Sequence, residues 1–310
     1  MVTDLVHKEV LSFENHIITW PRSGPGSESG KHTGTNWPEA PASRVAENSG
    51  VEQEIHKESV AKKQHNGLGQ PPAYFSSGVT MNKGGPGGLE FVIGHGLKGW
   101  LPGEFERIAN HPGVMVIDTR RPDDFRGAFI PNSISIGIDG NFAAWLRTLI
   151  RDFRRQILIV ADWGKEKEVI TRMARAGFDQ CLGYLEGGIS RWITSGKQID
   201  GIRAISATGL QNTAQGVSVI DVRETEEYES EHLLGAINLP LEQVDSKMKF
   251  IDPAKQYYVY CVNGYKSIMF CSILKSRGYK NITDVKGGFK AIRELRGLRK
   301  INSLKRAILL

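Results

Sequence analysis

The chain has 310 residues, of which 40% are hydrophobic and 24% charged, and it carries a formal net charge of +6 at pH 7. This is the balance of a soluble globular protein with room for two domains of ordinary size. No stretch approaches the ~20 apolar residues of a membrane-spanning helix, and the first residues lack the pattern of a secretory signal, so we expect a cytoplasmic protein.

The first 88 residues differ in composition from the rest of the chain. A turn-rich run covers 21–31, and a glycine cluster covers 84–88. Glycine and proline at this density argue against one compact domain, so we expect a poorly structured extension and linker over 1–88, with one short helix over 45–63. The five histidines in this segment show no metal-ligand spacing, and we expect neither a metal site nor a cofactor.

From residue 89 onward the sequence repeats itself. Four phrases recur in the same order, about one hundred residues apart: 114–120 with 217–223, 125–136 with 228–239, 157–160 with 257–260, and 185–192 with 285–292. That period indicates a duplicated domain, because solenoid repeats are much shorter. We expect domains over 89–199 and 200–296, followed by a basic tail over 297–310.

Each copy alternates short apolar runs with helical patterns. One helix is expected over Val169–Ala176, ending before Gly177, and its counterpart over Ser267–Arg277, ending before Gly278. Apolar strands that alternate with helices are typical of a parallel sheet covered on both faces. The predicted fold class is therefore α/β, with two tandem domains that each contain a parallel sheet flanked by helices.

The basic residues after Lys290 could attract an anion or a nucleic acid. No aromatic residues lie between these charges, as a nucleic-acid surface would require. We therefore expect a solvated, partly frayed terminal helix, and neither a nucleic acid nor a membrane as partner.

The most informative stretch is Tyr257–Ser267. An apolar strand ends at Tyr260, Cys261 follows, and a loop containing Gly264 leads to a helix expected to begin near Ser267. Ligands of open α/β sheets bind at the carboxyl ends of the strands, and a helix N-terminus favours negative charge. Both features favour a thiolate or a persulfide anion at Cys261, with Lys266 adding a positive charge near the end of the loop.

The other two cysteines are better explained as core residues. Cys271 lies at helical spacing with apolar neighbours, and Cys181 lies at the start of a predicted strand. The first copy has Ala161 where the second has Cys261, so we expect the first copy to be inactive.

The length of the Cys261 loop argues against a cysteine phosphatase. Such an enzyme would need a Cys-x5-Arg loop, whereas here the basic residue comes one position earlier.

The phrases Asp221-Val-Arg223, 231–240, Cys261–Ser267 and Val285–Phe289 together resemble a rhodanese domain. The resemblance implies a sulfurtransferase in which Cys261 carries sulfane sulfur as a persulfide, received from thiosulfate or a small persulfide and passed to a thiol or cyanide. It also implies a loop that cradles the persulfide: Val262, Asn263, Gly264, Tyr265, Lys266 and Ser267. Asp221 and Arg223 are expected to support the structure beneath the site, and His232 to hydrogen-bond at a turn.

Further phrases at 70–75, 79–85, 118–120, 129–140 and 183–188 resemble the C-terminal part of multidomain persulfide dioxygenase–sulfurtransferases. Those proteins place a metallo-β-lactamase-fold iron dioxygenase before a pseudo-rhodanese and a rhodanese domain. The metal motif of the dioxygenase is missing here, so residues 1–88 would be a remnant of that domain. The resemblance leaves an alternative open, namely a non-catalytic persulfide-binding or docking module that acts with a persulfide dioxygenase or a thiol acceptor protein in trans.

Overall fold

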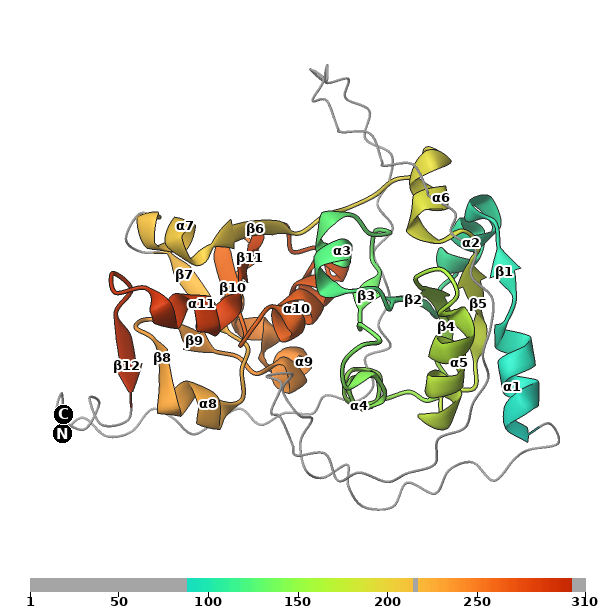
Figure 1. Ribbon diagram of the computed structural model, residues 1–310, viewed down its shortest axis with the longest axis horizontal. Coiled ribbons are helices and arrows are strands. Elements are labelled where there is room, and N and C mark those ends of the chain that lie inside the picture. The colour runs from blue at the N-terminus through green and yellow to red at the C-terminus, as the bar shows by residue number, and fades with distance from the viewer. Residues whose placement is uncertain (1–87, 214–216, 303–310) are drawn as a thin grey trace, which may run out of the picture. The chain divides into compact units, whose positions relative to one another are not determined.

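The computed structural model describes residues 88–213 and 217–302, and all of them fall within one compact unit of the chain that covers 66–310. The expected extension over 1–87, its short helix and its histidines lie outside the described residues. The described part contains two five-stranded parallel sheets with helices around them, which confirms the predicted fold class (Figure 1).

The first sheet has the strand order β1-β5-β4-β2-β3, and every pairing in it is parallel. Its strands are β1 (Gly99–Trp100), β2 (Val114–Asp118), β3 (Ile134–Ser135), β4 (Gln156–Val160) and β5 (Cys181–Leu185). Its helices are α1 (Gly88–Gly96), α2 (Pro102–Ala109), α3 (Pro122–Gly127), α4 (Phe142–Leu149), α5 (Glu166–Arg175) and α6 (Gly188–Thr194).

Both faces of this sheet are buried. Along β4, Ile157 and Ile159 pack into one apolar cluster, whereas Leu158 and Val160 pack into another. Successive side chains of a strand point to opposite faces, so a strand covered on both faces must be apolar throughout. This explains why the strands appear in the sequence as continuous apolar runs.

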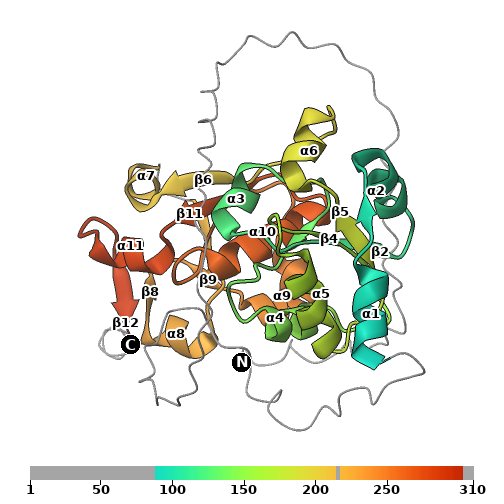
Figure 2. The same cartoon turned by 45° about the vertical axis from the view of Figure 1, so that its right-hand side comes forward.

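The second sheet repeats this topology with the order β6-β11-β10-β7-β9. Its strands are β6 (Arg203–Ser206), β7 (Ser218–Asp221), β9 (Ile237–Asn238), β10 (Tyr257–Tyr260) and β11 (Ile282–Lys286). Around it lie α7 (Ala207–Asn212), α8 (Thr225–Ser230), α9 (Val244–Lys247), α10 (Tyr265–Ser276), α11 (Gly288–Glu294) and the 3-10 turns η2 (Leu241–Gln243) and η3 (Met248–Phe250). The turned view in Figure 2 shows α10 beside β11 of this sheet, and α10 also contacts β10.

The expectation of a terminal helix after Lys290 is wrong for residues 300–302. Helix α11 ends at Glu294, and β12 (Lys300–Asn302) then pairs antiparallel with β8 (Glu231–Leu233). The Lys300 ammonium donates to the carbonyl of Leu295. Lys300 therefore helps to satisfy the open carbonyls at the end of α11 instead of facing solvent.

The long helix α10 belongs to the second domain and also packs against the first. The backbone N–H of Ser135 on β3 donates to Ser272 Oγ on α10 at 3.0 Å, and one apolar cluster contains side chains of both domains, among them Phe125 and Ile268. This helix is buried along nearly its whole length because it packs on its own sheet and on the first domain. Within 88–213 and 217–302, every helix is too short or too polar to cross a bilayer.

Candidate active site

Cys261 directly follows β10, at the carboxyl edge of the second sheet. Its Sγ accepts a hydrogen bond from the backbone N–H of Gly264 at 3.1 Å, and its side chain is only 1% exposed. The Cys261 carbonyl accepts the N–H of Phe289 at 2.6 Å, which ties the end of the strand to the first turn of α11. Cys261 is thus held at two points, through its sulfur by Gly264 and through its carbonyl oxygen by Phe289.

Gly264 makes the turn between Cys261 and α10. Its φ is +106°, a conformation that L-residues with a Cβ rarely adopt. Helix α10 begins at Tyr265, two residues before the expected start, so Tyr265 and Lys266 lie in its first turn instead of in the loop. The sulfur therefore lies beside the N-terminus of a twelve-residue helix, where negative charge is favoured.

Two of the six expected loop residues point away from the sulfur. The Tyr265 hydroxyl donates to the carbonyl of Gly137 in the first domain at 2.9 Å. The Lys266 ammonium is 2.5 Å from Glu224 Oε1 and lies over the Trp145 ring at 5.1 Å from its centroid. Lys266 is 2% exposed, so its charge is used in a partly buried ion pair with Glu224.

A second carboxyl group belongs to this ion pair. Glu242 lies beside Glu224, and its Oε2 has no hydrogen-bond partner among the described residues. Burial, together with the neighbouring Glu224 carboxylate, raises the pKa of Glu242 to about 7. The pKa of Glu224 is lowered: burial opposes this, but contacts with Glu242 and Lys266 outweigh it. Two carboxylate oxygens can hydrogen-bond only when one of them carries a proton, and Glu242 is the group that holds it.

Ser267 is the expected loop residue that does contact the sulfur. Its Oγ lies 3.6 Å from Cys261 Sγ and donates to Asp284 Oδ1 at 2.6 Å. The other oxygen of Asp284 accepts from Arg126 Nη1 of the first domain at 3.0 Å. Burial raises the pKa of Asp284, while the hydrogen bond from Ser267 and the charge of Arg126 act against that rise. Val262 and Asn263 complete the loop, half-buried and exposed respectively.

Asp221 and Arg223 form a buried ion pair after β7. Arg223 binds both carboxylate oxygens, with its Nη2 at 2.6 Å from Asp221 Oδ2, and also donates to the carbonyl of Glu231 at 2.8 Å. Asp118 and Arg120 of the first domain repeat this arrangement, with the same 2.6 Å contact. His232 Nδ1 lies 2.6 Å from the Tyr228 carbonyl, which leaves the ring bound at a turn.

The first domain has no thiol at the corresponding position. Ala161 follows β4, Gly164 has a φ of +79°, and α5 begins at Glu166. Between Ala161 and Gly164, Trp163 is 87% exposed.

The other two cysteines, Cys271 and Cys181, are buried, and burial raises the pKa of both thiols, that of Cys181 to about 11. In the described part of the chain, no three His, Cys, Asp or Glu side chains gather as a metal site would require.

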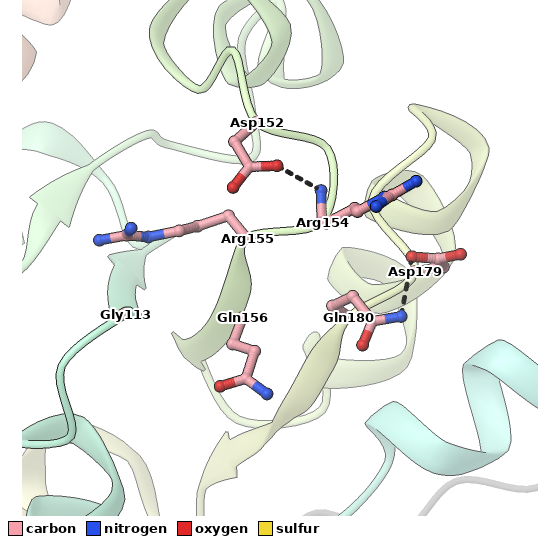
Figure 3. Close-up of a pocket in the computed structure, with 7 residues that line it drawn as sticks. All are labelled: Gly113, Asp152, Arg154, Arg155, Gln156, Asp179 and Gln180. Carbon is pink, nitrogen blue, oxygen red and sulfur yellow. Dashed lines mark hydrogen bonds between the residues drawn. The ribbon is translucent and has the colours of Figure 1, made fainter. Parts of the chain in front are cut away.

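A cleft of about 290 Å³ opens at the Cys261 loop. Asn263, Gly264 and Tyr265 form one wall, and residues of the first domain form the other: Arg121, Pro122, Asp123, Gly137, Asp139 and Gly140. A larger hollow of about 540 Å³ lies where β2, β4 and β5 of the first sheet begin, lined by Arg154, Arg155 and Gln180 among others (Figure 3). That hollow lies at the amino ends of strands of the first sheet, whereas the Cys261 loop lies at the carboxyl edge of the second sheet, so size alone does not identify the site.

The sequence did not reveal Asp284, Arg126, Glu224 and Glu242 as parts of the site. Asp284 interrupts the apolar run before the paired glycines Gly287 and Gly288, which was the available signal for a buried functional carboxylate. Arg126 lies 158 residues away from Asp284 along the chain, so no local pattern connects the two.

Comparisons with known proteins identify the family of both domains. The model of the family described as "Rhodanese-like domain" matches residues 101–195 and 206–295, together more than half of the chain. The thiosulfate sulfurtransferase PspE of Escherichia coli is 40% identical over 75 residues, which cover 24% of this chain and 71% of that protein. The protein YqhL of Bacillus subtilis is 42% identical over 72 residues, covering 23% of this chain and 57% of its own length.

The match to the first curated relatives is partial, spanning about half of their length. Among solved structures, a rhodanese-related protein from Thermoplasma volcanium is 31% identical with a TM-score of 0.30, covering 32% of this chain and 97% of that one. At that TM-score the match adds nothing to the assignment. The two family matches coincide with the two sheets, and the chain therefore belongs to the rhodanese-like domain family, of which it contains two copies.

Proposed function

We propose that this protein is a sulfurtransferase that carries sulfane sulfur as a persulfide on Cys261. One observation supports this most strongly: Cys261 Sγ lies at the N-terminus of α10 and accepts the Gly264 N–H at 3.1 Å. A persulfide anion at this position gains from the same helix dipole and backbone donor. The family assignment and the name of the relative PspE, a thiosulfate sulfurtransferase, support the sulfurtransferase part of this proposal.

The reaction is a double displacement. The Cys261 thiolate attacks the outer sulfur of thiosulfate, a new S–S bond forms, and the S–S bond of the donor breaks with its electron pair leaving on sulfite. A cyanide or thiolate acceptor then attacks the outer sulfur of the persulfide and releases the Cys261 thiolate. Because Cys261 is 1% exposed, small donors and acceptors suit the site best, and the cleft at Asn263 and Gly264 offers their approach.

The test is thiocyanate formation from thiosulfate and cyanide. Cys261→Ser should lower the rate by about a thousandfold or more, because a hydroxyl cannot carry sulfane sulfur. Cys271→Ser is the matched control: it removes a neighbouring buried thiol, and the rate should stay within a few-fold of the unmodified protein. Equal rates for the unmodified protein and Cys261→Ser would refute the proposal.

A second candidate function is a persulfide-binding or docking module that serves a persulfide dioxygenase or a thiol acceptor protein in trans. The nearly complete burial of Cys261, together with the exposed Trp163 on the first domain, favours it. Under this alternative, the protein with Cys261 intact forms no thiocyanate in multiple turnovers. The thiocyanate measurement therefore separates the two functions.

A further inference from the structure

A continuous row of polar groups leads from Cys261 into the first domain. Cys261 Sγ lies 3.6 Å from Ser267 Oγ, which lies 2.6 Å from Asp284 Oδ1, and Asp284 Oδ2 lies 3.0 Å from Arg126 Nη1. Cys261, Ser267 and Asp284 are each at most 1% exposed. Since water is excluded from these groups, the protons along the row are fixed by the protein itself.

The direction of each hydrogen bond follows from the donors present. Ser267 has a single proton, and a carboxylate at 2.6 Å can only accept it. The contact between Ser267 and Cys261 must therefore be made by the thiol proton, donated to Ser267 Oγ. In this arrangement the thiol proton points toward an ionised carboxylate with one hydroxyl between them.

The charges around Asp284 come from three elements. Arg126 and Asp123 face it from α3, the first as a direct partner and the second at longer range. From α10 it faces Ser267 and the neutral thiol of Cys271, near which Lys275 also lies. Cys261 approaches from the end of β10. Arg126 is therefore the one cation in direct contact with Asp284 among the described residues.

We propose that Cys261, Ser267 and Asp284 form a proton relay, in which Asp284 receives the thiol proton through the Ser267 hydroxyl. One proton moves from Sγ to Ser267 Oγ while another moves from that Oγ to Asp284 Oδ1, so no proton leaves the site. The result is a thiolate that accepts hydrogen bonds from Ser267 and Gly264. When the acceptor removes the sulfur and Cys261 is released, the two shifts reverse.

Arg126 is a positioning residue in this relay. Asp284 can receive a proton only if it is ionised, and a buried carboxylate without a countercharge takes up a proton instead. Arg126 supplies that charge from the first domain, which has Ala161 at the position that corresponds to Cys261. This gives the inactive copy a defined role: it sets the state of the proton acceptor in the active copy.

The inference rests on the proposed function, but its test does not require sulfur transfer. The rate of Cys261 alkylation by iodoacetamide is measured on the full chain from about pH 5 to about pH 9, with intact mass as the readout and Cys261→Ser as the blank. With the relay, part of the thiolate forms without loss of a proton, so the rate has a plateau in the acidic half of the range. In Asp284→Asn this plateau should disappear, and the rate should fall about tenfold per pH unit.

Four further variants test the other members of the relay. Ser267→Ala should lose the plateau as Asp284→Asn does, and it replaces Asp284→Asn in the test if that variant does not fold. Arg126→Gln should lose the plateau, and Arg126→Lys should restore it because the charge is kept. Asp200→Asn is the matched control: it removes another ion pair on α10, that of Lys275 with Asp200 at 3.0 Å, and should keep the plateau.

A plateau that survives in Asp284→Asn and Ser267→Ala would overturn the relay, as would a profile without a plateau in the unmodified protein. If the plateau is present and depends on Asp284 but no thiocyanate forms, the relay stands and the proposed sulfur transfer fails. If thiocyanate forms and the alkylation profile is unaffected by both substitutions, the proposed function stands and the relay is wrong.

Discussion

Side chains near the Cys261 loop contact specific partners, and the contact between Glu224 and Glu242 should make the stability of the folded protein depend on pH. The pKa of Glu242 is about 7 in the folded protein, against an ordinary value of 4.5. Folding therefore takes up a proton between these pH values, and the stabilisation from this group is full below pH 4.5 and is lost as the pH rises through about 7. The lowered pKa of Glu224 acts only below its ordinary value of 4.5, outside this window.

Glu242→Gln should remove this pH dependence, because an amide donates to Glu224 at every pH. Compared with the unmodified protein, the variant should gain melting temperature as the pH rises from about 5 to about 8. Glu226→Gln, which alters an exposed carboxylate on α8, is the control and should run parallel to the unmodified protein. Parallel melting profiles for Glu242→Gln would show that Glu242 does not hold a proton near neutral pH.

At the scale of elements, the two glycine pairs at the starts of α6 and α11 show what holds the loop. A Cβ on Gly288 would lie 2.4 Å from the Cys261 carbonyl oxygen, whereas a Cβ on Gly188 would lie 3.3 Å from the equivalent oxygen of Ala161. The two glycines have almost the same φ, +57° and +59°. Substitution by alanine should therefore carry the same conformational cost at both positions, but a larger steric cost at Gly288.

Gly188→Ala should lower the free energy of unfolding by about 1–2 kcal/mol, the cost of a left-handed L-residue. Gly288→Ala should cost more and should also reduce thiocyanate formation, because Cys261 must move away from the new methyl group. Chemical denaturation and the rate assay check both effects. Equal losses in the two variants would mean that the close approach of α11 to Cys261 is not important.

The same elements show what the sequence could predict. The repeated phrases predicted two parallel sheets, because strands buried on both faces appear as continuous apolar runs. The start of α10 was predicted two residues late, since Gly264 alone makes the turn and leaves Tyr265 and Lys266 in the helix. The direction of the Lys266 side chain was beyond prediction, because it depends on Glu224 and Trp145, which are distant in sequence.

At the scale of the whole described unit, the first domain is part of the environment of Cys261. Tyr265, four residues after Cys261, donates from its hydroxyl to the Gly137 carbonyl of the first domain. A Cβ on Gly140 would lie 2.6 Å from the Tyr265 ring, so the absence of a side chain there admits the ring. Arg126 adds a charged contact to Asp284. The copy that has Ala161 at this position thus shapes the site of the copy that has Cys261.

Gly140→Ala should displace Tyr265 and lower the rate of sulfur transfer several-fold, although residue 140 lies in the other domain. Gly103→Ala is the control, because a Cβ at that position meets nothing within 4 Å and the residue lies in α2. The control should keep the activity and gain slightly in stability, since alanine restricts the unfolded chain. If both variants have the unmodified rate, the first domain does not position the loop.

The most direct test of the central claim is the intact mass of the reduced protein after incubation with thiosulfate, compared with that of Cys261→Ser and Cys271→Ser. We predict a gain of one sulfur atom on the unmodified protein and on Cys271→Ser, removed by cyanide or by a thiol, and no gain on Cys261→Ser. A gain on Cys261→Ser, or its absence from the unmodified protein, would contradict the assignment of Cys261 as the sulfur carrier.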